Sequence, residues 1–279
     1  MKTYNAIDMK GRLYDFSLEH KETEKGEAIA GDIILEVDAE GTTVKIPFYS
    51  RPVFSSGKPN KTYGVLEDIM EGNILTVVNA GEDADWFGIS GSIDSSYFMA
   101  KGNKAEVARS QKMRGAFINS NPKKEYKNRW KLDFLITSIQ DIEADPQKQT
   151  DRFLKVGGYY VDSYNSRLAE VEFQARAEGA INFFSTLPIS PETPYYVDTW
   201  GEIKKVTRIV ERQNAFGESE SDEYETTSWV IVGVNVNPYS YGTDISEADY
   251  ATYKGELEAH KESLIKEATD SIGEEEIGF

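Results

Sequence analysis

Cysteine is absent from this chain of 279 residues, and it contains only two histidines, His20 and His260. Without thiols the chain cannot form disulfides, use a cysteine nucleophile or bind a metal through thiolates. Both histidines lie in charged stretches, LEHKETEKGE and LEAHKESL, which favours solvated side chains over catalytic ones. A Ser/His/Asp triad is therefore not expected.

Long apolar runs are also missing. No run approaches the roughly 18 apolar residues that suggest a membrane-spanning helix, and the opening MKTYNAIDMKGRLYDF lacks the apolar stretch of a signal peptide. Aromatic residues make up 12% and charged residues 28%, as in a soluble globular protein. The length is sufficient for two domains of about 100 to 150 residues each. We therefore expect a cytoplasmic protein with two domains.

Signatures of catalysis are scarce. The chain has no phosphate-binding G-x-x-x-x-G-K-[ST] motif. Acid pairs such as Asp83 with Asp85, or Glu36 with Asp38, can in principle hold magnesium for a nuclease. With 48 acidic residues, however, such pairs are expected by chance. We expect no enzyme activity, no cofactor and no bound metal, and keep a metal-dependent nuclease as a third alternative.

The charge is unevenly distributed, although the formal net charge is −17. Residues 101–131 contain ten basic residues against two acidic ones, whereas residues 241–279 contain eleven acidic residues against three lysines. Phe117, Tyr126 and Trp130 lie within the basic stretch. Cations neutralise phosphates and flat rings stack on bases, which is the combination that single-stranded nucleic acids require. The basic stretch is therefore a candidate binding surface.

Short segments rich in β-branched and aromatic residues dominate the first 240 residues and predict an all-β fold. In the first half they are residues 27–37, 42–50, 73–79, 86–93, 114–119 and 130–139. One helix is predicted over Thr62–Met70, where apolar residues recur at helical spacing. A short helix between the middle strands of a five-stranded barrel is typical of an OB-fold.

A second cycle of similar segments follows at residues 151–164, 167–179, 180–187, 193–213 and 227–238. We therefore predict tandem OB-fold barrels followed by a C-terminal helix and a disordered acidic tail. The first barrel, with an N-terminal extension, is assigned to residues 1–139, a linker to 140–151 and the second barrel to 152–240. The helix is assigned to 241–272, where Ser246 and Asp249 give a capping signal, and the tail to 273–279.

Alternation along VKIPFYSR predicts that Lys45, Tyr49 and Arg51 share one open face of a strand. Trp130 is in phase with apolar neighbours and is predicted to be buried. A thinner basic series in the second half consists of Arg167, Arg176, Lys204, Lys205, Arg208 and Arg212, with Tyr159, Tyr164 and Trp200 as candidate stackers. The predicted DNA-binding set is Lys45, Tyr49, Arg51, Phe54, Lys58, Lys61, Lys101, Lys104, Arg109, Lys112, Arg114, Lys123, Lys124, Tyr126, Lys127 and Arg129.

The last seven residues, GEEEIGF, resemble the tip of bacterial single-stranded DNA-binding proteins, an acidic run followed by Ile-Pro-Phe. Glu274, Glu275 and Glu276 match the acids, Ile277 the isoleucine and Phe279 the terminal phenylalanine, while Gly278 stands in place of the proline. The resemblance implies that residues Glu274 to Phe279 recruit replication, recombination and repair proteins. Tandem barrels with this ending look like a single-stranded DNA-binding protein of a bacteriophage, located in the host cytoplasm.

The sequence thus predicts a non-enzymatic, sequence-independent binder of single-stranded DNA that acts in phage DNA replication, recombination or repair. The alternative is an acidic viral structural or adaptor protein whose barrels bind protein instead of DNA.

Overall fold

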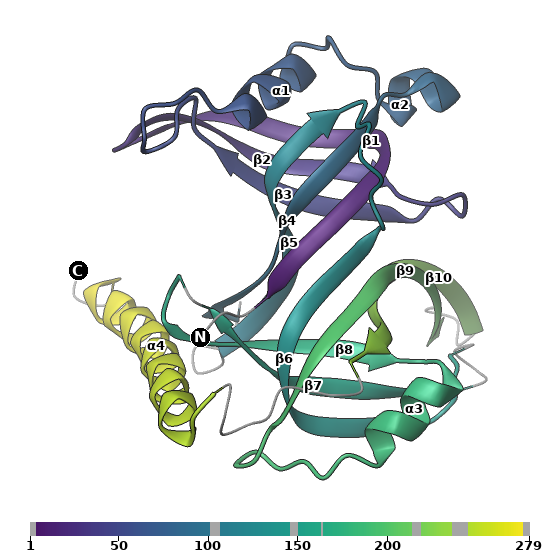
Figure 1. Ribbon diagram of the computed structural model, residues 1–279, viewed down its shortest axis with the longest axis vertical. Coiled ribbons are helices and arrows are strands. Elements are labelled where there is room, and N and C mark those ends of the chain that lie inside the picture. The colour runs from purple at the N-terminus through teal and green to yellow at the C-terminus, as the bar shows by residue number, and fades with distance from the viewer. Residues whose placement is uncertain are drawn as a thin grey trace.

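The computed structural model describes residues 4–100, 107–145, 150–162, 164–213, 219–235 and 245–275 (Figure 1). Ten strands are connected by hydrogen bonds into one sheet that forms two barrels. In chain order the elements are β1 (Asn5–Thr23), β2 (Gly26–Glu36), β3 (Thr43–Ser50), α1 (Lys61–Met70), α2 (Val77–Ala80), a 3-10 turn (Gly81–Asp83), β4 (Trp86–Met99), β5 (Val107–Ser120), β6 (Arg129–Ile142), β7 (Phe153–Asp162), β8 (Arg167–Ala175), α3 (Glu178–Ser185), β9 (Tyr195–Gln213), β10 (Ser219–Val234) and α4 (Glu247–Glu275).

The first barrel consists of β1 to β5. β1 pairs with both β2 and β4, β2 pairs with β3, and β4 pairs with β5. β3 lies beside β5, where the ring of Phe48 packs against Gly115 and closes the barrel. Helix α1 follows β3, as in an OB-fold, and it covers one end of the barrel (Figure 1). The predicted helix at 62–70 is thus confirmed.

Two segments near the N-terminus differ from the prediction. The expected N-terminal extension contains β1, a strand of 19 residues in which Ile7, Met9 and Leu13 are buried. The strand expected at residues 73–79 is instead a turn followed by the short helix α2, which Thr76 caps by accepting a hydrogen bond from the Asn79 amide. Its apolar Val78 points to solvent.

The second barrel begins at β6, which the sequence analysis had assigned to the first barrel. β6 pairs with β7 and β9 over most of its length, so it is a strand of the second barrel. β7 pairs with β8, β8 touches β10 at one parallel bridge, and β10 pairs with β9. The linker expected at 140–151 therefore contains the end of β6, and Asp145 and Thr150 within it form an antiparallel bridge. The chain passes between the barrels at residues 121–128.

Helix α3 occupies the place in the second barrel that α1 occupies in the first, between the third and fourth strands. The segment 180–187 was expected to be a strand. It forms this helix instead, with Phe184 completely buried. Both halves thus follow the order β-β-β-α-β-β, which confirms the tandem OB-fold.

The two barrels are joined through their first strands. Residues Asn5–Asp8 of β1 pair antiparallel with Arg129–Leu132 of β6, so the sheet continues from one barrel into the other. Buried side chains of both barrels form one hydrophobic cluster. Trp130 lies in it with no exposed surface and stacks on Phe173 at a centroid distance of 4.2 Å, as predicted for a core residue.

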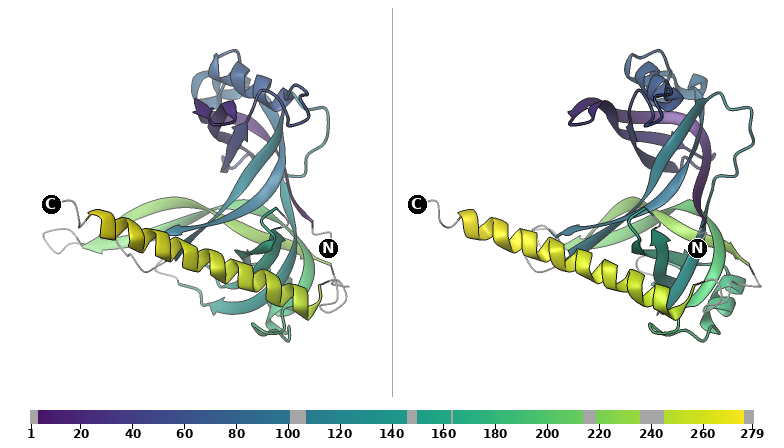
Figure 2. Two further views of the ribbon diagram at one scale, coloured as in Figure 1. Left: turned by 90° about the vertical axis from the view of Figure 1, so that its left-hand side faces the viewer. Right: turned by 60° about the vertical axis from the view of Figure 1, so that its left-hand side comes forward.

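Helix α4 packs along the outside of the second barrel (Figure 2). The predicted cap is confirmed, because the Asp249 amide donates to Ser246 Oγ at 3.1 Å. Tyr250 and Leu257 bury themselves in a second cluster with residues of β6, β7 and β8. The helix continues to Glu275, three residues beyond the predicted end, and residues 276–279 lie outside the described chain. No helix within the described ranges is long and apolar enough to span a membrane.

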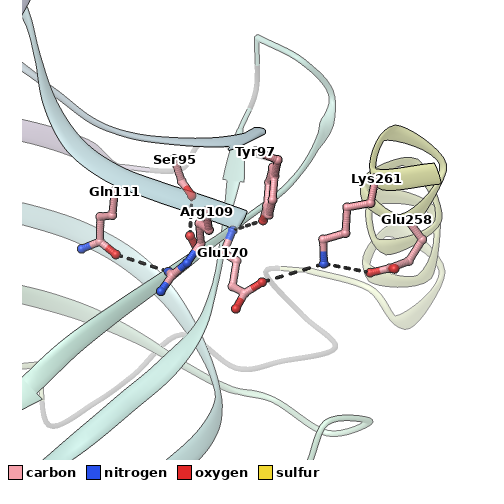
Figure 3. A network of polar contacts seen from close by, with 7 residues as sticks. All are labelled: Ser95, Tyr97, Arg109, Gln111, Glu170, Glu258 and Lys261. Carbon is pink, nitrogen blue, oxygen red and sulfur yellow. Dashed lines mark hydrogen bonds and ion pairs between the residues drawn. The ribbon is translucent and has the colours of Figure 1, made fainter. Parts of the chain in front are cut away.

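A polar network ties α4, β4 and β8 together (Figure 3). The Tyr97 hydroxyl accepts a hydrogen bond from the Glu170 amide at 2.9 Å, and Ser95 donates to the Glu170 carbonyl at 2.6 Å. Lys261 of α4 lies 3.8 Å from the Glu170 carboxylate and 5.3 Å above the Tyr97 ring. Burial raises the pKa of Tyr97 to about 12. The helix therefore fastens the β4–β5 hairpin to the second barrel.

Candidate nucleic-acid interface

The outer face of β3, together with the residue that follows the strand, carries three of the predicted residues. Lys45, Tyr49 and Arg51 are exposed, while Val44 and Phe48 are buried, as the alternation predicted. Nearly half of the Tyr49 side chain, 47%, is open to solvent. Lys45 Nζ lies 2.9 Å from a carboxylate oxygen of Asp32 on the adjacent strand β2. We call Lys45, Tyr49 and Arg51 the β3 face.

At Lys45 the β3 face opens into a cleft of about 360 Å³ between the two barrels. The aromatic ring among its lining residues is Trp229 of β10, which is half-buried and lies 6.3 Å and 6.2 Å from the rings of Trp130 and Phe173. We name this space the inter-barrel cleft. It is lined by Asp32, Val44, Lys45, Pro47, Gln111, Lys112, Met113, Ile203, Thr227 and Trp229.

The inter-barrel cleft combines apolar walls with cations. Lys45 and Lys112 face a single lining carboxylate, Asp32, while the nearest carboxylate to Lys112 outside the cleft, Asp94, is 4.0 Å away. An indole wall can stack on a base, and lysines can neutralise a phosphate. The sequence does not single out Trp229 as a site residue, because it lies in an apolar strand segment and only the opening between the barrels exposes it.

The loop that follows β3 is held in shape by its own backbone. The Phe54 amide donates to the Lys58 carbonyl at 2.9 Å, and the Gly57 amide donates back to the Phe54 carbonyl at 2.8 Å. Gly57 adopts a φ of 77°, which glycine tolerates best. Asn60 then caps α1 by accepting from the Thr62 amide at 3.1 Å. The loop therefore presents Phe54 on a folded turn, with 43% of the side chain exposed.

Phe54, Lys58 and Lys61 line a groove of about 300 Å³ together with Phe117 of β5. We call it the Phe54 groove, and no carboxylate is among its lining residues. Strict alternation from buried Met113 would turn Phe117 inward. A bulge at Ala116 shifts the register, because Gly91 opposes Gly115 while Ser90 opposes Phe117. The bulge leaves 55% of the Phe117 side chain exposed, and this residue was absent from the predicted set.

The rest of the predicted basic stretch does not form one surface. Arg109 donates to the Gln111 side chain at 3.4 Å, within the contact between β5 and β8. Arg114 lines a separate hollow of about 280 Å³ that also contains Asp94 and Asp162. Lys101 and Lys104 lie outside the described residues.

The loop between the barrels folds over the sheet. The Tyr126 ring lies against Gly88 of β4, and its hydroxyl accepts a hydrogen bond from Asn119 at 3.1 Å. Lys124 Nζ is 4.7 Å above that ring and 3.2 Å from Asp8 of β1. The neighbouring Lys123 and Lys127 are exposed and form no ion pair among the described residues.

Lys127 and Arg129 lead into a groove of about 320 Å³ where β1, β6 and β9 meet. Arg129 Nε is buried without a hydrogen-bond partner among the described residues, and the closest carboxylate, Glu202, is 3.7 Å away. The Trp200 ring packs against Gly233 of β10. We call it the junction groove, lined by Tyr4, Ala6, Ile7, Asp8, Lys127, Arg129, Trp130, Lys131 and Trp200.

Lys131 adds a further cation to the junction groove. Its ammonium lies 3.1 Å from Asp198 and 5.0 Å above the Tyr4 ring. Burial alone lowers the pKa of Lys131, but the hydrogen bond and the charge of Asp198 outweigh it and raise the pKa above the usual value. Lys131 is therefore charged at neutral pH.

The thinner basic series of the second half is dispersed. Arg176 lies 4.7 Å above the Phe153 ring, Tyr159 packs against the cluster beneath α4, and Tyr164 is almost fully exposed. The side chains of Arg208 and Arg212 lie outside the described part of β9. Of the predicted stackers in this half, only Trp200 lines a groove that also holds two or more cations among the described residues.

The acid pairs considered for magnesium serve the fold. The Asp85 carboxylate accepts from the Leu75 amide at 2.9 Å, and Asp38 accepts from the Thr42 amide at 2.9 Å. Glu36 forms an ion pair with Arg12 at 2.9 Å. Across the described ranges, no group of three or more His, Asp or Glu side chains is arranged to hold a metal ion.

Two successive OB-fold barrels, with aromatic rings and cations on their surfaces, place this chain in the class of tandem OB-fold proteins.

A model of the YorF family matches residues 3–271, and the chain belongs to that family. A search of curated proteins finds no match. A solved deletion variant of the single-stranded DNA-binding protein from Thermus aquaticus has a similar fold. It is 14% identical, with 86% of this chain and 97% of that chain covered and a TM-score of 0.50. The wild-type Thermus aquaticus protein is also 14% identical, with 88% of this chain and 100% of that chain covered and a TM-score of 0.47.

Proposed function

We propose that the chain is a non-enzymatic protein that binds single-stranded DNA without sequence preference. The observation that carries the proposal is the β3 face, where an exposed tyrosine stands between two cations and leads into the inter-barrel cleft. OB-folds bind oligonucleotides on the face of their second and third strands, which are β2 and β3 here. The structural neighbour, by its name, binds single-stranded DNA.

The chemistry of this surface suits a flexible strand better than a duplex. Tyr49 and Trp229 offer ring faces to unstacked bases, and every base has a π-face, so stacking is tolerant of sequence. Lys45, Arg51 and Lys112 are placed to neutralise backbone phosphates. The Phe54 groove, which begins three residues beyond Arg51, extends the same combination of rings and lysines.

The proposal is tested by titrating oligo-dT while following anisotropy at several salt concentrations. Binding should weaken as salt rises, with a log-log slope of about −0.7 for each phosphate neutralised. Replacing Lys123, Lys124 and Lys127 together should flatten this slope by up to about 2. Absence of binding at low salt, or binding that does not depend on salt, would overturn the proposal in favour of an acidic adaptor protein.

A paired substitution tests the β3 face itself. Tyr49→Ala should lose about 1 to 3 kcal/mol of binding free energy, because stacking on one ring contributes roughly that much. Tyr14→Ala is the matched control, since Tyr14 is a similarly exposed tyrosine on β1. Equal affinities of the two variants would place the DNA elsewhere.

We further propose that the tip, Glu274 to Phe279, recruits host replication, recombination or repair proteins in the host cytoplasm during phage DNA metabolism. The support is the match of its acids, isoleucine and terminal phenylalanine to the bacterial tip. Host proteins captured by the full chain should be lost with Phe279→Ala and retained with Ser271→Ala. Equal capture by the full chain and the Phe279→Ala variant would refute a role for the tip.

A further inference from the structure

The junction groove shares no lining residue with the inter-barrel cleft or the Phe54 groove. We propose that it is a second single-stranded DNA site, which holds a phosphate between cations and stacks a base on a ring. One chain would then bind two segments of a strand at once. This inference rests on the proposed function, since it assumes that the ligand is single-stranded DNA.

The groove lies on a surface that is continuous between the barrels. Ser90 of β4 is opposite Phe117 of β5 and Asp8 of β1, and Asp8 is opposite Arg129 of β6. Since residues opposite one another in a sheet share a face, these four side chains form one outward row across four strands. A strand can therefore follow this face from the first barrel to the second.

Cations exceed acids in the junction groove. Lys127, Arg129 and Lys131 line it, and Asp8, the one carboxylate among its described lining residues, is already paired with Lys124. Glu202 and Asp198, which are not lining residues, lie 3.7 Å from Arg129 and 3.1 Å from Lys131, while Lys127 forms no ion pair among the described residues. Arg129 keeps a buried Nε without a hydrogen-bond acceptor, and buried donors are rarely left unsatisfied. A phosphate oxygen is the acceptor that a guanidinium fork recognises best.

Two of the rings in and beside the groove are fixed before any ligand arrives. Trp200 lies on Gly233, and Tyr126 lies on Gly88 with its hydroxyl bonded to Asn119. Tyr4 is half-exposed beside them, under Lys131. Rings held in place lose little conformational entropy on binding, which favours affinity.

The Phe54 groove connects the two sites. On one side its loop continues from Arg51 of the β3 face, and on the other its lining residue Asn119 bonds to Tyr126. A long strand can thus run from the inter-barrel cleft along the β3 face, through the Phe54 groove and over Tyr126 to the junction groove. A short oligonucleotide can occupy only one of the two ends.

Stoichiometry with a short oligonucleotide separates the sites. Isothermal titration of oligo-dT of about eight nucleotides, within the usual site size of one OB-fold, should give two molecules per chain. The double variant Lys127→Ala/Arg129→Gln should bind one, and Lys45→Ala/Tyr49→Ala should also bind one. Lys21→Ala/Lys25→Ala removes two exposed lysines at the β1–β2 turn, away from both sites, and should still bind two.

Fluorescence gives a second readout that does not depend on stoichiometry. In the Lys45→Ala/Tyr49→Ala background, Trp200→Phe should remove most of the quenching that a short oligonucleotide causes. One molecule bound per wild-type chain, with Lys127→Ala/Arg129→Gln binding like the wild type, would refute the second site and leave the proposed function standing. Absence of binding by every form, the wild type included, would refute the proposed function itself. Circular dichroism of each variant confirms that its barrels are folded.

Discussion

Glycine residues set the position of two aromatic rings on the outside of this molecule. Gly88 and Gly233 are strand residues whose missing side chains leave room for the rings of Tyr126 and Trp200 against the backbone. Glycine normally weakens a strand interior and often marks such a close approach. At these two positions, the loss of intrinsic strand stability gives a ring a fixed place.

The substitution Gly88→Ala, which adds one methyl group, tests whether the place of the Tyr126 ring depends on this glycine. The added methyl group would collide with the Tyr126 ring, which must move and give up its hydrogen bond from Asn119. We expect a several-fold loss of affinity for long oligo-dT and a small change in melting temperature, because the displaced ring lies at the surface.

Gly64→Ala in helix α1, where nothing lies within 4 Å, is the control for Gly88→Ala. It should bind normally and melt slightly higher. A Gly88→Ala variant with normal affinity would exclude Tyr126 from the interface.

For some single residues, the sequence is sufficient to predict whether the side chain is buried or exposed. Trp130 could be assigned to the core because its apolar neighbours share its phase, and the β3 face could be predicted from simple alternation. Phe117 could not, since the bulge at Ala116 reverses its face and leaves no mark in the local sequence. Trp229 could not be assigned either, because its exposure depends on where the two barrels part.

At the scale of elements, the fold class was predictable but the division between the barrels was not. The sequence predicts six strand segments for a first barrel that has five strands, because β1 is missing from the prediction while β6 and the segment 73–79, which contains α2, are included. β6 carries the strongest apolar run of its region, and that run fits either barrel. Its membership is decided by hydrogen bonds to β7 and β9, which are long-range contacts that no local pattern contains.

Helix α4 should bind less tightly to the barrel in acid. Burial lowers the pKa of His260, and the charge of Arg167 lowers it further, so the folded state favours the neutral imidazole, which lies 6.2 Å from the Tyr97 ring and nearly perpendicular to it. Because the pKa of His260 in the folded state is lower than the normal value of about 6.5, the neutral imidazole stabilises the packing of α4 above that pH. This stability is lost as the pH falls through the pKa of His260 in the folded state. Hydrogen-exchange protection factors in α4 should therefore drop between about pH 7.5 and about pH 5.

Two histidine variants complete this test. His260→Gln should remove most of the pH dependence of the protection factors in α4. His20→Gln should not, because His20 is exposed on β1, where it pairs with Glu27. Protection in wild-type α4 that is independent of pH over this range would contradict the role assigned to His260.

For the whole molecule, the distribution of charge predicts self-competition. The acidic C-terminal region and the cations near the barrel junction have opposite signs, so the tail should compete with DNA at low salt. Deleting residues 273–279 should tighten oligo-dT binding several-fold at low ionic strength and have little effect at high ionic strength, where screening is strong. Replacing Glu274, Glu275 and Glu276 by glutamine should reproduce most of the effect. An affinity unchanged by the deletion at low salt would exclude this competition.

The pairing between the first strands of the two barrels also constrains how the chain folds as it is synthesised. The Tyr4 amide bonds to the Asp133 carboxylate across 129 residues, and Asn5–Asp8 pair with β6. The start of β1 must therefore wait until β6 has left the ribosome. Long-range strand pairing of this kind is slow, and unpaired edges promote aggregation in the meantime. The start of β1 is thus among the last parts of the first barrel to reach its final place.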